Sequence, residues 1–254
     1  MPGQLIATLT AAVLLAACGN AEASADRPAL HPSRAETAAT PVAQPAPTQA
    51  NDHLPAPLVD PGLDLRAGPV NVPLELRIPS LRISAPVLGV GLTPKNVMDT
   101  PTGSASDPLW REAFWYRGGG IPGDASTATI AGHVDDVLGR PAVFAGLKDL
   151  RPGDPIVVHD NRTGQDVNFV VTTTATYSVR QTLDPTVLTQ IYGTGPVTGQ
   201  GPQPSSDGLA HLTLITCTGH WVNGWGTYDH RLAVYAVGLP SQLVNALDSQ
   251  HQRS

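Results

Sequence analysis

The chain has 254 residues and a formal net charge of −6 at pH 7, so it can hold one domain of ordinary size plus tails. It offers no basic excess, which argues against a nucleic-acid-binding surface and against nucleic acid as a partner. Every aromatic residue lies between Trp110 and Tyr235, so the first 109 residues can contribute little to a hydrophobic core.

An apolar segment opens the chain. "LIATLTAAVLLAA", residues 5–17, carries no charge; it suits a secretory signal and is too short to span a bilayer comfortably. It runs into "LAAC", residues 15–18, which resembles a bacterial lipobox, where the cysteine is lipidated before cleavage. No Lys or Arg precedes the run, so a plain signal or a short uncleaved anchor stays open. We predict a signal segment over residues 1–18, lipidation at Cys18, and export to the outer face of the cytoplasmic membrane.

A spacer follows the signal segment. Residues 19–72 are rich in Pro, Ala, Thr and Gln and show no apolar period. Such a segment cannot bury enough surface to offset its chain entropy, and its prolines favour an extended spacer. We therefore expect a disordered linker over 19–72, a folded domain over 73–240 and a C-terminal tail over 241–254.

The first half of the domain is predicted to contain short strands and one helix. "LELRIPSLRISAPVLGVG", residues 74–91, reads as two β-rich pieces broken at Pro79 and Pro86, which favours edge or bent strands. Residues 127–133, "TATIAGH", read as a strand that ends in Gly-His. Residues 141–150, "PAVFAGLKDL", place apolar side chains at helical spacing after a proline, which predicts a helix.

The second half is predicted to be richer in strands. Residues 155–160 form a strand and 161–165 a turn, and the near-alternation over 167–179 indicates a long strand with one buried face. Residues 184–192 predict a short helix capped by Asp184, followed by a flexible Gly/Pro-rich loop over 193–208.

Two final strands, "LAHLTLITC" (209–217) and "RLAVYAVGL" (231–239), are joined by residues 218–230. Many strands, one or two short helices and Gly/Pro-rich turns predict a mainly β fold in the form of a closed barrel.

A set of short motifs resembles one protein family. "TLITC" (213–217) matches the Thr-Leu-x-Thr-Cys signature of the sortases. "AGH" (131–133) is similar to their histidine motif, and "RLAVYA" (231–236) to their arginine-bearing final strand. Two further segments resemble their first strands and the segment after the histidine: "RIPSLRISAPVLGVG" (77–91) and "FAGLKDLRPGD" (144–154). The resemblance covers residues 74–239, the whole predicted domain.

This resemblance implies an eight-stranded β-barrel cysteine transpeptidase of Gram-positive cell surfaces. Sortases cleave a sorting signal such as Leu-Pro-x-Thr-Gly between Thr and Gly and join the Thr to an amine, or to water. The implied partners are surface proteins with a C-terminal sorting signal and an amine acceptor of the cell wall or of a peptide, and no cofactor is implied. The combination of a lipobox or short anchor, a Pro-rich spacer and one domain most resembles the actinobacterial class F sortases.

Cys217 is the expected nucleophile. If Cys18 is lipidated or removed, Cys217 is left as an unpaired and reactive thiol in an exported protein. A thiolate attacks carbonyls well but needs nearby positive charge. The resemblance assigns proton transfer to His133 and oxyanion stabilisation to Arg231. Thr216 either helps to position the substrate or is an ordinary β-branched strand residue.

Several alternatives compete with this interpretation. His211, His220 and His230 also lie near the cysteine in sequence, and His220 could reach Cys217 locally. Together with Cys217 they offer zinc-ligand types, but their spacing matches no familiar zinc framework, so no metal is expected.

Two alternative protein classes also remain. The L,D-transpeptidases place an arginine two residues past their cysteine, where this chain has Gly219. A non-catalytic β-barrel lipoprotein that binds peptides or wall fragments would leave Cys217 unreactive. The loops 181–208 and 218–230 are expected to shape the binding groove, with Trp221 and Trp225 either walling it or packing.

Overall fold

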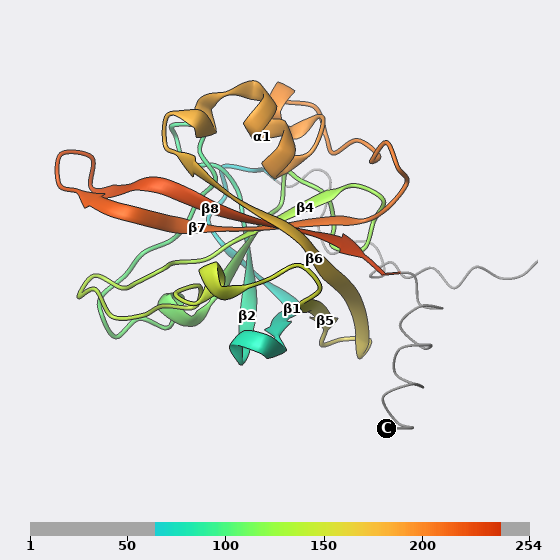
Figure 1. Ribbon diagram of the computed structural model, residues 1–254, viewed down its shortest axis with the longest axis horizontal. Coiled ribbons are helices and arrows are strands. Elements are labelled where there is room, and N and C mark those ends of the chain that lie inside the picture. The colour runs from blue at the N-terminus through green and yellow to red at the C-terminus, as the bar shows by residue number, and fades with distance from the viewer. Residues whose placement is uncertain (1–63, 240–254) are drawn as a thin grey trace, which may run out of the picture. The chain divides into compact units, whose positions relative to one another are not determined.

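The computed structural model describes residues 64–239. Within them, eight strands close into a single barrel in the order β1-β2-β3-β4-β7-β8-β6-β5, drawn in Figure 1. This architecture confirms the predicted mainly β barrel. Cys18, the signal segment, most of the expected linker and the tail over 241–254 lie outside the described residues.

The barrel is built from short strands, with a single α-helix in the described part of the chain. The elements are β1 (Val70–Ile78), β2 (Ile83–Val90), β3 (Ala113–Tyr116), β4 (Thr127–Ala131), β5 (Pro155–Asp160), β6 (Gln165–Ser178), α1 (Pro185–Tyr192), β7 (His211–Val222) and β8 (Thr227–Gly238). The β2–β3 and β4–β7 pairs are parallel and the other pairs are antiparallel. No helix over residues 64–239 has the length and apolar character needed to cross a membrane.

The inward faces of the strands form the main hydrophobic core. Because side chains alternate along a strand, Leu212 and Leu214 of β7 and Leu232 and Val234 of β8 point into the barrel and are buried there. The intervening residues of both strands, which include Cys217, therefore lie on the outer face.

A second apolar cluster covers part of that outer face. Met98, Phe114, Tyr116 and Ala131 are buried in it, and Ile215 of β7 packs against it. The outer face of β7 is thus covered near its middle, at Thr213 and Ile215, and is partly accessible at Cys217. This cluster makes the floor on which a cleft can form.

The helix α1 confirms the prediction over 184–192. The Asp184 carboxylate accepts a hydrogen bond from the Thr186 amide, Pro185 occupies the first turn, and Gly193 ends the helix with a φ of 80°. The Thr129 hydroxyl of β4 donates to the Ile191 carbonyl at 2.7 Å and ties the helix to the barrel. Figure 1 shows α1 at one end of the barrel, above β4, β7 and β8.

The helix predicted over residues 141–150 does not form. Phe144, Leu147 and Leu150 are buried, as the apolar spacing predicts, but the backbone makes successive turns with only a 3-10 turn at Leu147–Asp149. The amides of Val143 and Phe144 donate to the carbonyls of Trp110 and His133. Further along, the amides of Ala145, Leu147, Asp149 and Leu150 donate to carbonyls three residues earlier, so the backbone forms consecutive turns and not the i→i−4 ladder of an α-helix.

One of the two prolines interrupts the chain between strands as predicted, and the other does not. Pro79 does end β1 and opens a 3-10 turn, but Pro86 lies inside β2. Pro86 pairs with Glu75 beside a register shift in β1, and such a bulge tolerates a residue without an amide hydrogen. Neither strand is an edge strand, because the barrel is closed.

The described domain begins earlier than residue 73. The Leu65 carbonyl accepts a hydrogen bond from the Leu92 amide at 2.7 Å, and Arg66 Nη1 donates to the Thr93 carbonyl at 3.0 Å. Residues 64–69 thus lie against the barrel before β1 starts at Val70.

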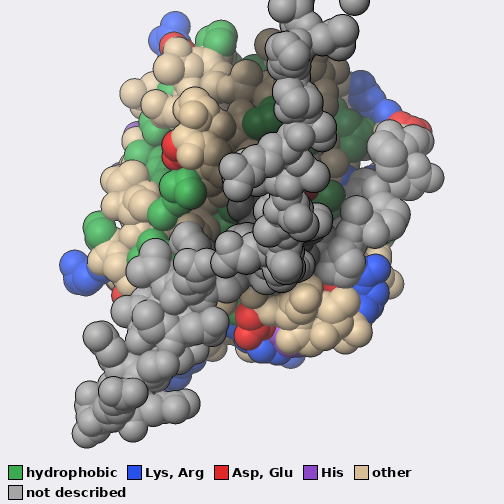
Figure 2. Space-filling view, turned by 90° about the vertical axis from the view of Figure 1, so that its right-hand side faces the viewer, with side chains coloured by type: hydrophobic (Ala, Val, Ile, Leu, Met, Phe, Trp, Pro, Cys, Tyr) green, Lys and Arg blue, Asp and Glu red, His purple; other side chains and the backbone are tan. Residues whose placement is uncertain are grey.

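The long strand β6 is buried on one face only in its first half. Val167, Phe169 and Val171 are buried, but a register shift between Val171 and Thr173 follows, and Thr173 is exposed. Beyond this point the residues of β6 are exposed or half-buried, although they pair with Leu232 and Val234 of β8, which are buried in the core. On the part of the surface visible in Figure 2, Lys and Arg side chains lie apart from one another and form no continuous basic area.

Candidate active site

Cys217 and Arg231 face each other across two adjacent strands. They form a direct pair in the antiparallel β7–β8 ladder, on the outer face of the barrel. Directly opposed residues of this kind place their Cβ atoms about 4.5–5.5 Å apart. Cys217 is partly exposed and carries a free thiol. The ladder therefore brings a thiol and a permanent cation together although fourteen positions separate them in sequence.

The β4–β7 pair brings His133 to the same place. Ala131 pairs with Ile215 in parallel register, the Gly132 amide donates to the Ile215 carbonyl at 3.1 Å, and the Thr216 hydroxyl donates to the Gly132 carbonyl at 2.8 Å. The residue before His133 is thus tied to the two residues before Cys217. A Cβ added at Gly132 would lie 2.5 Å from Phe144 Cδ2, so the close approach requires glycine.

The ring of His133 is held by three neighbours. Its Nε2 lies 2.8 Å from the Pro101 carbonyl, and its ring packs on Trp110 and Phe114 with centroids 4.8 and 5.4 Å apart. A carbonyl oxygen only accepts, so Nε2 carries a proton in this contact. In the neutral ring Nδ1 is then the nitrogen that can accept a proton.

The Arg231 guanidinium is held by its own strand. Nη1 donates to the carbonyls of Tyr228 and His230, each at 2.9 Å, and Nη2 donates to Thr227 Oγ1 at 3.0 Å. A guanidinium has five N–H groups, so the Nε–H and one N–H of Nη2 stay available. They can donate to an oxygen that carries negative charge next to Cys217.

One cleft of about 380 Å³ contains all of these groups. His133, Thr216, Cys217 and Arg231 line it together. The remaining lining includes apolar side chains of the second cluster and residues of the hairpin between β7 and β8: Met98, Ala131, Tyr192, Ile215, Trp221, Gly226, Thr227 and Tyr228. The volume falls in the range of small-ligand sites, so the cleft can receive a short extended peptide.

The side chain of Thr216 is buried, unlike that of the adjacent Cys217. The Thr216 hydroxyl proton is used by the Gly132 carbonyl. The hydroxyl therefore joins the strands of the nucleophile and the histidine, and it has only lone pairs left for another partner.

A substitution tests the role of this bond. Thr216→Val keeps the side-chain shape but leaves the buried Gly132 carbonyl without its partner, which should lower the free energy of unfolding by about 1–3 kcal/mol. Denaturant unfolding measures this loss, and Thr216→Ser should restore most of it because the hydroxyl returns. An unchanged unfolding midpoint in the valine variant would show that the bond contributes nothing to stability.

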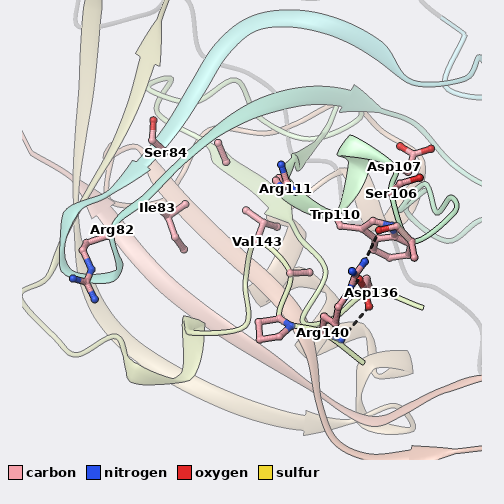
Figure 3. A pocket seen from close by; sticks show the side chains of 14 residues that line it. Arg82, Ile83, Ser84, Ser106, Asp107, Trp110, Arg111, Asp136, Arg140 and Val143 are labelled. Carbon is pink, nitrogen blue, oxygen red and sulfur yellow. Dashed lines mark hydrogen bonds and ion pairs between the residues drawn. The ribbon is translucent and has the colours of Figure 1, made fainter. Parts of the chain in front are cut away.

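A wider groove lies on the other side of Trp110. It encloses about 910 Å³, and Trp110 and Asp136 line both this groove and the cleft. Figure 3 shows Asp136 and Arg140 joined at one end of it and Arg82 at the other. None of His133, Cys217 and Arg231 lines this groove, so the larger cavity is separate from the candidate chemistry.

The other histidines do not line the cleft. His211 pairs with Asp207 at 3.0 Å and His230 with Asp229 at 2.7 Å, and the His220 side chain is 95% exposed. Within residues 64–239 no group of three or more His, Cys, Asp or Glu side chains could hold a metal ion.

The expected groove loops contribute unequally. The segment 218–230 is not a loop, because β7 continues to Val222 and β8 begins at Thr227. Trp221 lines the cleft and packs on Tyr228, whereas Trp225 is 63% exposed and does not line it. From residues 181–208, Tyr192 at the end of α1 is the residue that reaches the cleft.

Sequence reasoning missed Asp135 and Tyr228, which also line the cleft. The Tyr228 hydroxyl donates to Asp135 Oδ2. This hydrogen bond, together with burial and the charges of Asp135 and Cys217, raises the pKa of Tyr228 to about 12. Burial likewise raises the pKa of Tyr192 to about 12. A phenol is neutral near pH 7 even at its usual pKa of about 10, so both hydroxyls keep their proton there. Only their proximity in sequence to His133 and Arg231 could have indicated Asp135 and Tyr228.

A closed β-barrel that presents a free cysteine, an arginine and an oriented histidine in one cleft has the make-up of a cysteine-dependent acyl-transfer enzyme. The sortase domain family matches residues 76–238 of this chain. The chain belongs to the sortase family, whose members are cysteine transpeptidases that act on sorting signals. This assignment removes the L,D-transpeptidase and the non-catalytic lipoprotein from consideration.

Solved structures similar to the chain are themselves sortases. A lid mutant of sortase A from Corynebacterium diphtheriae is 21% identical, with 68% of this chain and 73% of that chain covered and a TM-score of 0.44. Sortase C-1 from Actinomyces oris is 22% identical over 66% of this chain and 73% of that chain, with a TM-score of 0.43. No curated protein matches the chain.

Proposed function

We propose that this sortase cleaves a Leu-Pro-x-Thr-Gly-like sorting signal between Thr and Gly and transfers the Thr carbonyl to an amine acceptor, or to water. The observation that carries the proposal is the direct pairing of Cys217 with Arg231 beside the oriented ring of His133 in one cleft. A thiol nucleophile, a proton carrier and an oxyanion donor are the groups that acyl transfer needs.

The reaction proceeds in two half-reactions. The Cys217 thiolate attacks the Thr carbonyl carbon, and the oxyanion accepts hydrogen bonds from the free N–H groups of Arg231. The carbon–nitrogen bond to Gly then breaks, His133 supplies the proton that the leaving amine takes up, and a thioester remains on Cys217. An incoming amine gives a proton to His133, attacks the thioester and releases the thiolate.

The setting of this reaction is the bacterial cell surface. The apolar segment before Cys18 and the Pro-rich spacer support export and attachment at the outer face of the membrane. The same features, with a single domain, support a class F type of enzyme from a Gram-positive actinobacterium. Its partners are surface proteins that carry a C-terminal sorting signal and an amine of the cell wall or of a peptide.

A panel of peptides tests the proposed reaction. The chain is incubated with fluorogenic pentapeptides that vary the sorting signal, with and without a primary amine, and the products are identified by mass spectrometry. Cleavage after Thr, with the Thr joined to the amine, is the expected result. Cleavage at another bond, or no thioester on Cys217 with any peptide, contradicts the proposal.

Attachment through Cys18 has its own test. Cys18→Ser should leave an unprocessed precursor in a lipoprotein-processing host, because the serine cannot carry the thioether-linked lipid. Two or more acyl chains give stable attachment where one gives marginal binding. Mass spectrometry of the mature N-terminus checks the expectation, and cleavage at another residue or an intact Met1 contradicts it.

A further inference from the structure

Beyond Cys217 and Arg231 the hairpin of β7 and β8 continues as an arm, residues 219–228, attached through a bulge. The ladder pairs Thr218 with His230 and next pairs Trp221 with Tyr228. Gly219 in the bulge has a φ of 88°, and a Cβ there would lie 2.1 Å from Asp229 Oδ1. The bulge interrupts the ladder bonds at this point, and the His220 amide donates to Asp229 Oδ1 at 2.8 Å instead.

Within the described residues, a single side-chain hydrogen bond ties this arm to the opposite wall of the cleft. The Tyr228 hydroxyl donates to Asp135 Oδ2, and across residues 64–239 this is the one hydrogen bond from the arm to anything outside β7 and β8. Asp135 lies two residues after His133, and its backbone is held by a bridge to Pro141. The contact therefore joins the histidine wall of the cleft to the arginine wall.

The arm also holds the Arg231 guanidinium. Two of the three acceptors that bind it, Thr227 Oγ1 and the Tyr228 carbonyl, belong to the arm. His133 is held independently, by the Pro101 carbonyl and by the rings of Trp110 and Phe114. A shift of the arm would consequently move the guanidinium while leaving His133 in place.

We propose that Tyr228 and Asp135 form a positioning pair, whose hydrogen bond holds the arm against the histidine wall and so aims the free N–H groups of Arg231 at the carbonyl on Cys217. The inference rests on the proposed function, since it assigns Arg231 to the oxyanion. Among residues 64–239 no hydrogen bond joins either residue of the pair to Cys217 or His133, so we place the effect of the pair on Arg231.

The test compares single-hydroxyl deletions. Tyr228→Phe removes the donor and keeps the ring that packs on Trp221. Thr172→Val is the control, because it likewise deletes one hydroxyl, which donates to the Tyr235 carbonyl at 3.0 Å, and Thr172 neither lines the cleft nor pairs with Arg231. We expect Tyr228→Phe to lower kcat about tenfold or more, as small misplacements of catalytic groups do, with KM changed less than about twofold. The control should stay within about twofold of the native enzyme in both parameters.

Combined variants separate positioning from general loss of structure. Asp135→Ala should lose as much kcat as Tyr228→Phe, and the double variant no more than either, because the two share one bond. In an Arg231→Ala background Tyr228→Phe should cause no further loss. Full additivity with Arg231→Ala, or native kcat in Tyr228→Phe, overturns the proposal.

Hydrogen–deuterium exchange of the full chain adds a measurement that needs no substrate. Amides of residues 219–228 should exchange faster in Tyr228→Phe than in the native protein, while those of β4 and β5 stay unchanged. If the amide exchange rates of the arm are unchanged in Tyr228→Phe, the proposal that this hydrogen bond holds the arm is wrong, even if turnover falls. Failure of the native enzyme to form a thioester with any sorting peptide would instead contradict the proposed function, and the exchange result still decides whether the pair holds the arm.

Discussion

Replacing Cys217 with alanine should abolish transpeptidation while leaving the barrel folded. The thiol is the one nucleophile in the cleft that can form a thioester, so kcat should fall by about 10⁴-fold or more, the scale on which removal of a catalytic nucleophile acts. The residue is partly exposed on the outer face and makes no disulfide. The free energy of unfolding should therefore change by less than about 1 kcal/mol.

Mass spectrometry and denaturant unfolding check the two halves of this expectation. The native chain mixed with a sorting peptide should gain the mass of the acyl fragment, and the alanine variant should not. Cys217→Ser is a useful companion, because its hydroxyl keeps the size of the group and is a far weaker nucleophile. Peptide cleavage by the alanine variant at the native rate would remove Cys217 from the mechanism.

Replacing Arg231 should slow the chemical step strongly and weaken substrate binding much less. Arg231→Lys keeps the positive charge but loses the planar fork, three of whose N–H groups are already engaged by Thr227, Tyr228 and His230. A lysine ammonium cannot satisfy these acceptors and also reach the oxyanion. Loss of one oxyanion donor costs about 3 kcal/mol, or about a hundredfold or more in kcat. KM should rise less, because the oxyanion develops mainly in the transition state.

Steady-state kinetics of Arg231→Lys and Arg231→Ala measure the fall in kcat and the rise in KM separately. Circular dichroism and thermal unfolding serve as folding controls, because either substitution also removes bonds that hold the start of β8. Arg162→Lys is a matched control substitution outside the cleft. Arg162 lies in the turn after β5 and forms an ion pair with Asp160, the last residue of that strand. Native turnover in folded Arg231→Ala would make the arginine structural and leave the oxyanion to another donor.

Local patterns in the sequence predicted most of the strands and one helix. The Asp184 cap and the following Pro185 are signals within one turn of backbone, and α1 forms where they place it. The apolar spacing over 141–150 correctly predicted which side chains are buried but not the backbone that carries them. The later amides of that segment donate to carbonyls three residues earlier, and apolar spacing alone does not distinguish such turns from an α-helix.

The sequence by itself determined that this chain is mainly β and that Cys217, His133 and Arg231 are its candidate chemical groups. It could do so because alternation and short motifs are properties of neighbouring residues. Only the tertiary structure decided that these three residues share one cleft, since the β4–β7 and β7–β8 registers set their proximity. It alone placed Asp135 opposite Tyr228, because that hydrogen bond joins segments 93 positions apart and depends on the closure of the whole barrel.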